Sequence, residues 1–380
     1  MELKEYRFDE VTINFDKKRV PLSGAQREKR QGNFRYYGAQ GVIDHIDDFI
    51  FDGTYLLIAE DGENLKSKKQ NIAQVVEGQF WVNNHAHIVQ GNELCNTRYL
   101  CYLLNSMDLS GYVTGSAQPK LSQANLNAVT LFLPSITVQE RIVECLYLFD
   151  KKIAVNQKIN DNLQQQAQSY FQELFVDNAD PEWTIGTISD LGSVVGGSTP
   201  SKAKPEYYTE SGIAWITPKD LSVNKSKFIS HGENDITELG LKNSSASIMP
   251  EGTVLFSSRA PIGYIAIAAG EVTTNQGFKS VIPKSEIGTP FVYFFLKHNL
   301  PVIEGMASGS TFKEVSGSTM KNIPAVIPDA ETLARFNDFC TPIFAQQRIL
   351  EEQSQSLAAL RDNLLPKLMS GEIDVSDIQL

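Results

Sequence analysis

Basic and aromatic side chains alternate with glycine near the start of the sequence. From Lys17 to Arg35 there are seven cations and one anion, Glu28, and glycines interrupt the run. Three aromatic residues, Phe34, Tyr36 and Tyr37, lie in or beside it. Cations neutralise phosphates and aromatic rings stack on bases, so this pattern indicates a nucleic-acid-binding loop. The alternative is a solvated run of charge beside a core strand.

Two histidines lie two residues apart in a strand-like segment, Phe80 to Ile88. His85 and His87 would therefore point to the same side of that strand. They could contribute to a metal site, but no third ligand is evident near them. The four cysteines form no Cys-x-x-Cys pair either. We expect no metal here, and hydrogen bonding in a core or at DNA instead.

No catalytic motif is visible. The sequence lacks a Walker motif, His-Glu-x-x-His, Gly-x-Ser-x-Gly, and the Asn/Asp-Pro-Pro-Tyr/Phe and glycine-rich strand of S-adenosylmethionine-dependent methyltransferases. The glycine-rich run from Val194 to Lys202 does not end in the Gly-Lys-Ser/Thr of a phosphate-binding loop. We therefore expect a binding protein rather than an enzyme.

The charge is unevenly distributed. The net charge of −11 argues against a general nucleic-acid coat. Residues 1–134 carry only −2 of it and residues 181–328 only −1, so the remaining segments are the acidic ones. The near-neutral regions can therefore hold local basic patches. No run of eighteen apolar residues occurs, and the N-terminus has no signal-peptide pattern. With the unpaired cysteines, this indicates a cytoplasmic protein without a membrane span.

A long helix is expected from Thr137 to Leu174, because apolar residues recur there with alternating spacings of four and three. Asn156 and Asn160 fall on the same stripe. A rod of this length needs a partner helix, and adding 194 to each position yields one. The stripe of the first helix is Ile142, Leu146, Phe149, Ile153, Leu163, Ala167, Tyr170 and Leu174, and that of the second is Phe336, Cys340, Ile343, Gln347, Leu357, Arg361, Leu364 and Leu368.

The same offset relates other segments, so the chain is a duplication. It carries Gly115-Ser116 onto Gly309-Ser310 and Leu133-Pro134 onto Ile327-Pro328. Each half is a globular region followed by a long helix. We expect a first domain at residues 1–134, a central helix at 135–178, a second domain at 179–328, and a C-terminal helix with its tail at 329–380.

The two globular regions share a frame but differ in their loops. Trp215 matches Tyr36 at an offset of 179, and Trp183 roughly repeats Tyr6. Arg259 falls near the place of the Asp61-Gly62 turn, and the segment 274–278 matches 83–87. Asp52-Gly53, between strand-like residues, predicts a hairpin turn. Two modules with one frame and different loops should bind similar targets with different specificity.

These segments together resemble the specificity subunit of type I restriction-modification systems, over nearly the whole chain. The resemblance rests on the run from Gly115 to Ile142, the Gly-Ser-Thr-Pro at 197–200, Trp215-Ile-Thr-Pro-Lys-Asp220, Thr274-Asn-Gln-Gly-Phe278, and the ending from Leu364 to Ile373. The first region departs from the commoner form, because it has Tyr36-Tyr-Gly-Ala-Gln-Gly41 and no Gly-Ser-Thr-Pro opening.

The resemblance implies an α/β (α+β) fold with two target recognition domains built on twisted sheets. Two long antiparallel helices would separate the domains, with pseudo-twofold symmetry. Each domain would read one half of a split double-stranded DNA target, and the helices would set the gap. The subunit itself would bind no cofactor. It would recruit two methylation subunits that use S-adenosylmethionine, and restriction subunits that use ATP and Mg²⁺. The alternative is the equivalent adaptor of a fused, type IIB-like restriction-methylation enzyme.

We expect cationic and amide side chains on loops to carry the DNA contacts. For Asn275 and Gln276 the alternative is that they satisfy backbone groups in a buried turn. The candidates are Arg27, Lys29, Arg30, Arg35, Lys66, Lys68, Asn84 and His85 in the first domain, and Lys202, Lys204, Lys219, Arg259, Asn275 and Gln276 in the second.

Overall fold

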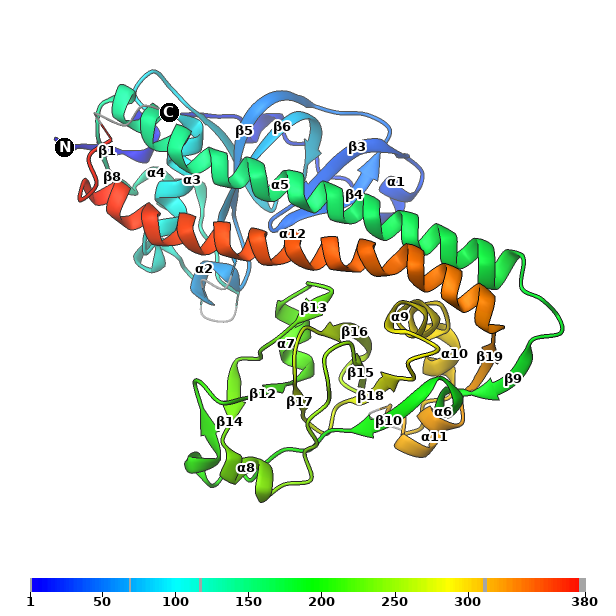
Figure 1. The fold of residues 1–380 in the computed structure, drawn as a ribbon. Helices are drawn as coiled ribbons and strands as arrows, with labels where there is room; N and C mark the ends of the chain where they lie inside the picture. Colours follow the sequence, from blue (N-terminus) through cyan, green and yellow to red (C-terminus); the bar gives the residue numbers. More distant parts are fainter. Residues whose placement is uncertain (1, 68–69, 116–117, 310–312, 376–380) are drawn as a thin grey trace. The chain divides into compact units, whose positions relative to one another are not determined.

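The computed structural model describes residues 2–67, 70–115, 118–309 and 313–375, so the candidate Lys68 lies outside the described residues. The chain divides into two compact units. The first consists of residues 1–152 and 356–380, and the second of residues 153–355. Each unit combines one α/β region with one segment of each of two long helices (Figure 1).

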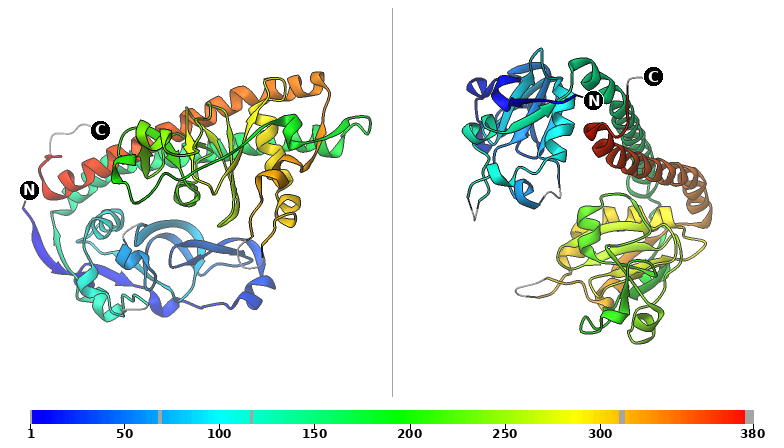
Figure 2. Two further views of the ribbon diagram at one scale, coloured as in Figure 1. Left: turned by 90° about the horizontal axis from the view of Figure 1, so that it is seen from below. Right: turned by 90° about the vertical axis from the view of Figure 1, so that its left-hand side faces the viewer.

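The two long helices are α5 (Ile136–Gln172), which ends in a π-helical turn, and α12 (Ala330–Ser370). The 37 residues of α5 span ~55 Å at ~1.5 Å per residue. In each unit the α5 segment runs antiparallel to the α12 segment (Figure 1, Figure 2). Asp150 meets Arg361 in the first unit, and Tyr170 meets Phe336 in the second. The two long antiparallel helices expected from the sequence are present.

The apolar stripe is the buried face of these helices. Ile142 and Leu146 in the first unit, and Ala167, Phe336 and Cys340 in the second, are all 0% exposed. Each helix therefore buries the residues that recur with heptad-like spacing, against its antiparallel neighbour and against the α/β region of the same unit.

Polar residues interrupt the seam between the helices of the second unit, and they meet one another. Asn156 Nδ2 donates to Ser354 Oγ at 3.2 Å. Gln347 Nε2 donates to the carbonyl of Asn160 at 3.1 Å, and Asn160 Nδ2 donates back to the carbonyl of Gln347 at 3.5 Å. Only one register of the two helices satisfies these pairs, so the polar seam specifies how the helices align.

Each unit carries a two-stranded antiparallel ladder in the same register. Lys4 pairs with Leu133 in the first unit, and Thr184 pairs with Ile327 in the second. The offset is therefore 180 at the first strand and 194 at the second. The ladders are β1 (Lys4–Arg7) with β8 (Thr130–Leu133), and β9 (Thr184–Thr187) with β19 (Pro324–Ile327).

The expected match of Trp183 with Tyr6 is wrong by three residues, because ladder pairing rather than the shared aromatic character sets the register. The helical turn that follows each ladder confirms the offset of 180. The Phe8 amide donates to the carbonyl of Val129 at 2.9 Å, and the Ile188 amide donates to that of Ile323 at 3.0 Å.

The α/β region of the first unit is built on one six-stranded mixed sheet. Asp52-Gly53 does not form the expected hairpin turn. The strand runs straight through it, because Gly53 pairs with Gly78 inside the ladder. In sheet order the strands are β2 (Thr12–Asn14), β7 (Ala86–Gly91), β5 (Phe51–Ala59), β6 (Ala73–Val82), β3 (Gln31–Gly38) and β4 (Gly41–Ile46), and the helices are α1 (Gly24–Glu28), α2 (Asn64–Ser67), α3 (Thr97–Ser106) and α4 (Gln123–Asn127).

The second unit repeats this arrangement with the sheet divided in two. Where the first unit has the single strand β6, the second has β16 and then β17, so the parallel pairing passes to a separate sheet. One sheet contains β10 (Gly192–Gly196), β18 (Lys279–Pro283), β15 (Val254–Ser258), β16 (Ile262–Ala268) and β13 (Phe228–Ile229). The other contains β11 (Tyr208–Thr209), β14 (Asn234–Ile236), β12 (Ile213–Ile216) and β17 (Thr273–Thr274). The helices are α6 (Ile188–Leu191), α7 (Pro218–Val223), α8 (Glu238–Lys242), α9 (Thr289–His298), α10 (Leu300–Gly305) and α11 (Gly317–Lys321).

Candidate nucleic-acid interface

Several loops of the second unit meet where β12, β15 and β17 end. The Asn275 amide donates to the carbonyl of Ile216 at 3.0 Å, and the Ser258 amide donates to that of Gly277 at 2.8 Å. The Val315 amide in turn donates to the carbonyl of Ser258 at 3.0 Å. We call these loops, residues 197–202, 217–219, 258–260, 275–277 and 313–315, the second junction.

A hollow of about 430 Å³ opens at the second junction. Its floor includes the indole of Trp215, whose Nε1 donates to the carbonyl of Ser198 at 3.0 Å. Lys204 lies apart from it and donates to the hydroxyl of Tyr207 at 3.1 Å. The structure thus brings together five of the six residues predicted for this domain: Lys202, Lys219, Arg259, Asn275 and Gln276.

Two cations of the second junction, Arg259 and Lys219, are held in ion pairs at the surface. Arg259 lies 3.3 Å from Glu314, which also lies 3.5 Å from the ammonium of Lys279. Lys219 pairs with Glu233, and the hydrogen bond that it donates to this carboxylate raises the pKa of the lysine. Exposed pairs of this kind contribute about 0–1 kcal/mol, so these cations can exchange partners when an anionic ligand arrives.

Asn275 and Gln276 play different parts in the turn that they share. The side-chain oxygen of Asn275 accepts the amide of Gly277 at 2.8 Å, which is the turn-stabilising role considered as the alternative. Gln276 is exposed, and its Oε1 accepts the hydroxyl of Thr199. Gln276 is therefore the residue of this pair that projects from the junction.

Gly197 allows two loops of the second junction to touch. A Cβ at this position would lie 2.0 Å from the carbonyl oxygen of Asn275 and 2.4 Å from Thr274 Oγ1. We expect Gly197→Ala to lower the free energy of unfolding by about 1–3 kcal/mol, because backbone atoms must move apart. Urea denaturation measures this change. Gly196→Ala is the matched control, since its Cβ would meet nothing closer than 3.9 Å. Equal effects of the two substitutions would contradict the close approach.

The first unit builds a junction on the same backbone frame. The Asn83 amide donates to the carbonyl of Tyr37 at 3.0 Å, the Glu60 amide to that of His85 at 2.9 Å, and the Leu121 amide to that of Glu60 at 2.8 Å. The Asn83 side chain also accepts the His85 amide at 2.8 Å. We call residues 38–40, 60–66, 83–85 and 118–121 the first junction.

The shared frame shifts the expected equivalence by one residue. Asn83, rather than Asn84, occupies the place of Asn275, because both side chains accept the amide two residues ahead. Asn84 then corresponds to Gln276, and both are exposed. The expected equivalence of Tyr36 with Trp215 is confirmed, since these residues hold the same place in parallel pairs of strands.

Different side chains occupy the first junction. His85 Nδ1 lies 2.7 Å from Asp61, and the ammonium of Lys120 lies 3.2 Å from Glu60. Lys66 donates to the carbonyl of Gly115 at 2.9 Å. Sequence reasoning missed Gln40 and Lys120 here. The offsets of 179 and 194, applied to Lys219 and Glu314, identify both positions.

Arg19 of the basic run pairs with Glu60 of the first junction at 3.1 Å. The other three arginines, Arg27, Arg30 and Arg35, lie outside the junction, before or within β3. Each makes a polar contact and covers an aromatic ring. Arg27 pairs with Asp44 over Tyr36, Arg30 pairs with Asp47 over Trp81, and Arg35 donates to the carbonyl of Glu77 over Tyr37. Lys29 is exposed beside them. The candidates of the first domain therefore form two groups, one at the first junction and one before and within β3.

His87 is buried in the core of the first unit. Its Nδ1 lies 2.6 Å from Asp16, and its Nε2 lies 2.8 Å from the carbonyl of Leu121. Burial by itself would lower the pKa of His87, but the bonds to Asp16 and Leu121 outweigh it and raise that pKa. Burial by itself would raise the pKa of Asp16, but the hydrogen bonds from His87 and from the Ile88 amide outweigh it and lower that pKa. Among the described residues, no group of three or more His, Cys, Asp or Glu residues could hold a metal ion.

The ion pair of His87 with Asp16 makes the stability of the first unit depend on pH. The contribution of His87 is complete below its ordinary pKa of 6.5 and is lost as the pH rises through the raised value. That of Asp16 is present above its ordinary pKa of 3.8 and is lost as the pH falls through the lowered value. We expect the free energy of unfolding of the first unit to fall above pH ~6.5 and His87→Gln to remove this decline. Denaturation at several pH values measures it, and His85→Gln, at a more exposed site, should leave it unchanged.

The architecture is that of a duplicated protein with two structurally equivalent α/β regions, each ending in a long helix. The chain belongs to the family described as the type I restriction modification DNA specificity domain, whose model matches residues 2–165 and again 181–367. The two matches coincide with the two repeats. Among the described residues, no helix is long and apolar enough to cross a membrane.

Similar proteins carry the same description. The chain is 39% identical over 194 residues to the type I restriction enzyme MjaIX specificity subunit of Methanocaldococcus jannaschii, a match that covers 49% of this chain and 45% of that protein. It is 26% identical over 343 residues to a putative type I specificity subunit of Haemophilus influenzae, covering 84% and 82%. The crystal structure of the type I S subunit from M. genitalium has the same fold, with a TM-score of 0.62, 15% identity, and coverage of 97% and 96%.

Proposed function

We propose that this chain is the non-catalytic specificity subunit of a type I restriction-modification complex, and that each α/β region reads one half of a bipartite duplex DNA target at its junction. The observation that carries the proposal is the shared frame. Both junctions rest on the same backbone hydrogen bonds, yet they present different side chains. A constant frame with exchanged side chains suits two modules that read different sequences.

The side chains of the second junction suit both kinds of DNA contact. Arg259 and Gln276 match the acceptor and donor edges of purines in the major groove. The lysines suit phosphates, which set register without carrying sequence information. In the first unit, Asn84 and His85 are the counterparts that face bases, and the arginine group beside β3 lies further along the duplex. Lys66 adds a phosphate contact at the first junction, and Lys29 adds one beside the arginine group.

The helices serve protein rather than DNA. The helical segments with their flanks carry most of the net charge of −11, which is unfavourable beside phosphates. They hold the two recognition domains apart and dock two methylation subunits, which bring S-adenosylmethionine for methylation of adenine. Restriction subunits, which use ATP and Mg²⁺, complete the assembly.

Coexpression with the neighbouring methylation subunit, followed by sequencing of the modified adenines in the host genome, tests the function. We expect one split motif with a gap of fixed length. Exchange of either α/β region for that of a relative should change one half-site and leave the other. Methylation that ignores this chain, or a motif without a gap, would remove the proposal.

Arg259→Ala tests base reading at the second junction. We expect modification of the cognate site to fall by the equivalent of about 1–3 kcal/mol and one base position of one half-site to become degenerate. Motif sequencing with the variant measures both effects. Lys242→Ala is the control, because Lys242 is an exposed cation on α8, away from the junction. An equal loss on every sequence would instead assign Arg259 to phosphate binding.

A further inference from the structure

A loop of the second unit, residues 224–229, is fastened to α12 by directional hydrogen bonds. The carboxylate of Glu351 accepts two successive amides, that of Lys227 at 3.0 Å and that of Phe228 at 3.1 Å. One turn further along α12, Gln355 Nε2 donates to Ser226 Oγ at 3.3 Å. The two oxygens of one carboxylate therefore determine where this loop lies along the helix.

Lys227 extends from the same loop into the protein. It is only 8% exposed, and its ammonium donates to Gln347 Oε1 at 2.5 Å. The ammonium also lies over the ring of Phe344, 4.1 Å from its centroid, and over that of Tyr293 at 5.0 Å. A buried cation with one polar acceptor and surrounding rings has few alternative positions.

Gln347 connects Lys227 to the other long helix, α5. Its oxygen accepts Lys227, and its Nε2 donates to the carbonyl of Asn160 on α5. A continuous chain of hydrogen bonds thus runs from the recognition region to α12 and then to α5, all within the second unit. Gln347 was visible in the sequence as a polar interruption of the stripe, but the structure shows what it binds.

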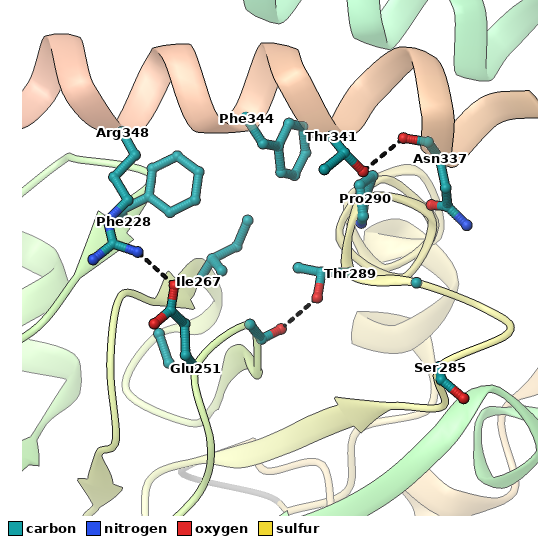
Figure 3. Close-up of a pocket in the computed structure, with 13 residues that line it drawn as sticks. Phe228, Glu251, Ile267, Ser285, Thr289, Pro290, Asn337, Thr341, Phe344 and Arg348 are labelled. Atoms are coloured by element: carbon teal, nitrogen blue, oxygen red, sulfur yellow. Dashed lines mark hydrogen bonds and ion pairs between the residues drawn. The ribbon is translucent and has the colours of Figure 1, made fainter. Parts of the chain in front are cut away.

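A second contact lies beside the first, around a hollow of about 320 Å³ that Figure 3 shows. Arg348 reaches down from α12 to Glu251 at 2.6 Å and to the carbonyl of Ala269 at 2.7 Å. Phe344 and Phe228 both line this hollow and meet edge to face, with ring centroids 6.1 Å apart. Contact between two rings beside open space does not fix their relative position, whereas the hydrogen bonds on either side of them are directional and do.

The first repeat lacks these side chains at the equivalent positions of its own long helix, α5. The offset of 194 places Ile153 where Gln347 stands and Gln157 where Glu351 stands. Gln157 bonds Asp161 on its own helix at 2.8 Å. The frame that the two repeats share therefore does not account for these contacts, which depend on side chains of the second repeat.

We propose that Lys227, Gln347 and Glu351 form a clamp that fixes the orientation of the second recognition region on the helix pair, and so determines the number of base pairs between the two half-sites. This inference rests on the proposed function. Adding one base pair moves a half-site by ~3.4 Å along the duplex and rotates it by ~35°. A recognition region held only by contacts between aromatic rings can move with the displaced half-site. A region held by directional hydrogen bonds cannot.

The test is the distribution of gap lengths among modified sites, with the full chain and its methylation subunit. Lys227→Met keeps the apolar stem and removes the ammonium. Glu351→Ala removes both acceptors of the loop amides, and Glu351→Gln keeps one. We expect unchanged half-sites and at least a tenfold increase in modification of sites whose gap is one base pair longer or shorter. This increase should be larger for Glu351→Ala than for Glu351→Gln. Lys225→Met, an exposed cation on the same loop, should behave as wild type.

The outcomes separate the clamp from the function on which it rests. If wild type itself modifies no split motif, the proposed function fails. If wild type modifies one motif and the folded Lys227→Met and Glu351→Gln variants keep its single gap, the clamp is refuted. Thermal unfolding identifies any variant that fails to fold. A merely structural role would reduce modification of all sites together without changing the preferred gap.

Discussion

Phe336→Ala is expected to lower the free energy of unfolding of the second unit by about 3–5 kcal/mol, the usual cost of removing a fully buried aromatic ring. Phe336 is 0% exposed where α12 meets α5 and the α/β region. Its ring lies 5.1 Å from that of Phe175 and 5.9 Å from that of Phe171, measured between centroids. Its removal leaves a cavity that three elements must close together.

Urea denaturation of the full chain measures this loss. Phe339→Ala is the matched control, since Phe339 lies one turn further along α12 and is 42% exposed. Its ring lies 4.7 Å from that of Tyr170, measured between centroids. We therefore expect Phe339→Ala to lower the free energy of unfolding by about 1 kcal/mol. A loss at Phe336 no larger than that at Phe339 would show that the helices of this unit do not depend on the aromatic cluster.

Lys227→Met is expected to stabilise the second unit by about 1–4 kcal/mol at pH 6, although it removes a hydrogen bond. Burial lowers the pKa of Lys227 to about 7, and this effect outweighs the opposing attraction of Glu351. Lys297 adds repulsion, while Cys340 and Tyr293 also face the ammonium. Below pH 7 the folded state therefore contains a costly buried charge, which an apolar side chain of similar length avoids.

The pH dependence tests the same reasoning with a worked sign. The unfolded chain holds the Lys227 proton up to its ordinary pKa of 10.5, whereas the folded state releases it at about 7. Between these values the unfolded state binds more protons, so the stability of the second unit rises with pH by up to ~1.4 kcal/mol per pH unit. Denaturation at pH 6, 7, 8 and 9 should show this rise for the second unit in wild type and in Lys225→Met, and none in Lys227→Met. A rise that persists in Lys227→Met would assign it to another group.

Lys227→Met should therefore raise the stability of the second unit and at the same time make the position of its recognition region on the helices less precise. The same substitution that removes a buried charge also removes the bond that fixes the loop to Gln347. Buried polar groups can be retained for the geometry that they specify rather than for the stability that they add. A more stable variant with a less strictly defined gap would demonstrate this for the second unit.

Some structural features followed directly from residue spacing. The stripe from Ile142 to Leu174 is the buried face of α5, because a helix returns each third or fourth residue to one side. The offset of 194 predicts α12 from the stripe of α5. Asn156 and Gln347 were visible as polar interruptions of their stripes, and each meets a polar group on the other helix.

Other features depended on neighbours that the sequence does not name. Asp52-Gly53 has the composition of a turn, yet β5 runs through it because Gly53 pairs with Gly78 of β6. The sequence alone groups Arg27, Arg30 and Arg35 with Asn84 and His85. The structure places these arginines outside the junction that holds Asn84 and His85, against Tyr36, Tyr37 and Trp81.

The sequence by itself determined the duplication, the two long helices and the family, because periodicity and repeated order are properties of the chain alone. Only the tertiary structure decided which loops meet at the junctions and which residues they present there. It also decided that Lys227 reaches Gln347, at a separation of 120 residues. The physical reason is that hydrogen bonds between distant segments depend on the packing of everything between them, whereas the pattern of buried and exposed positions along a helix does not.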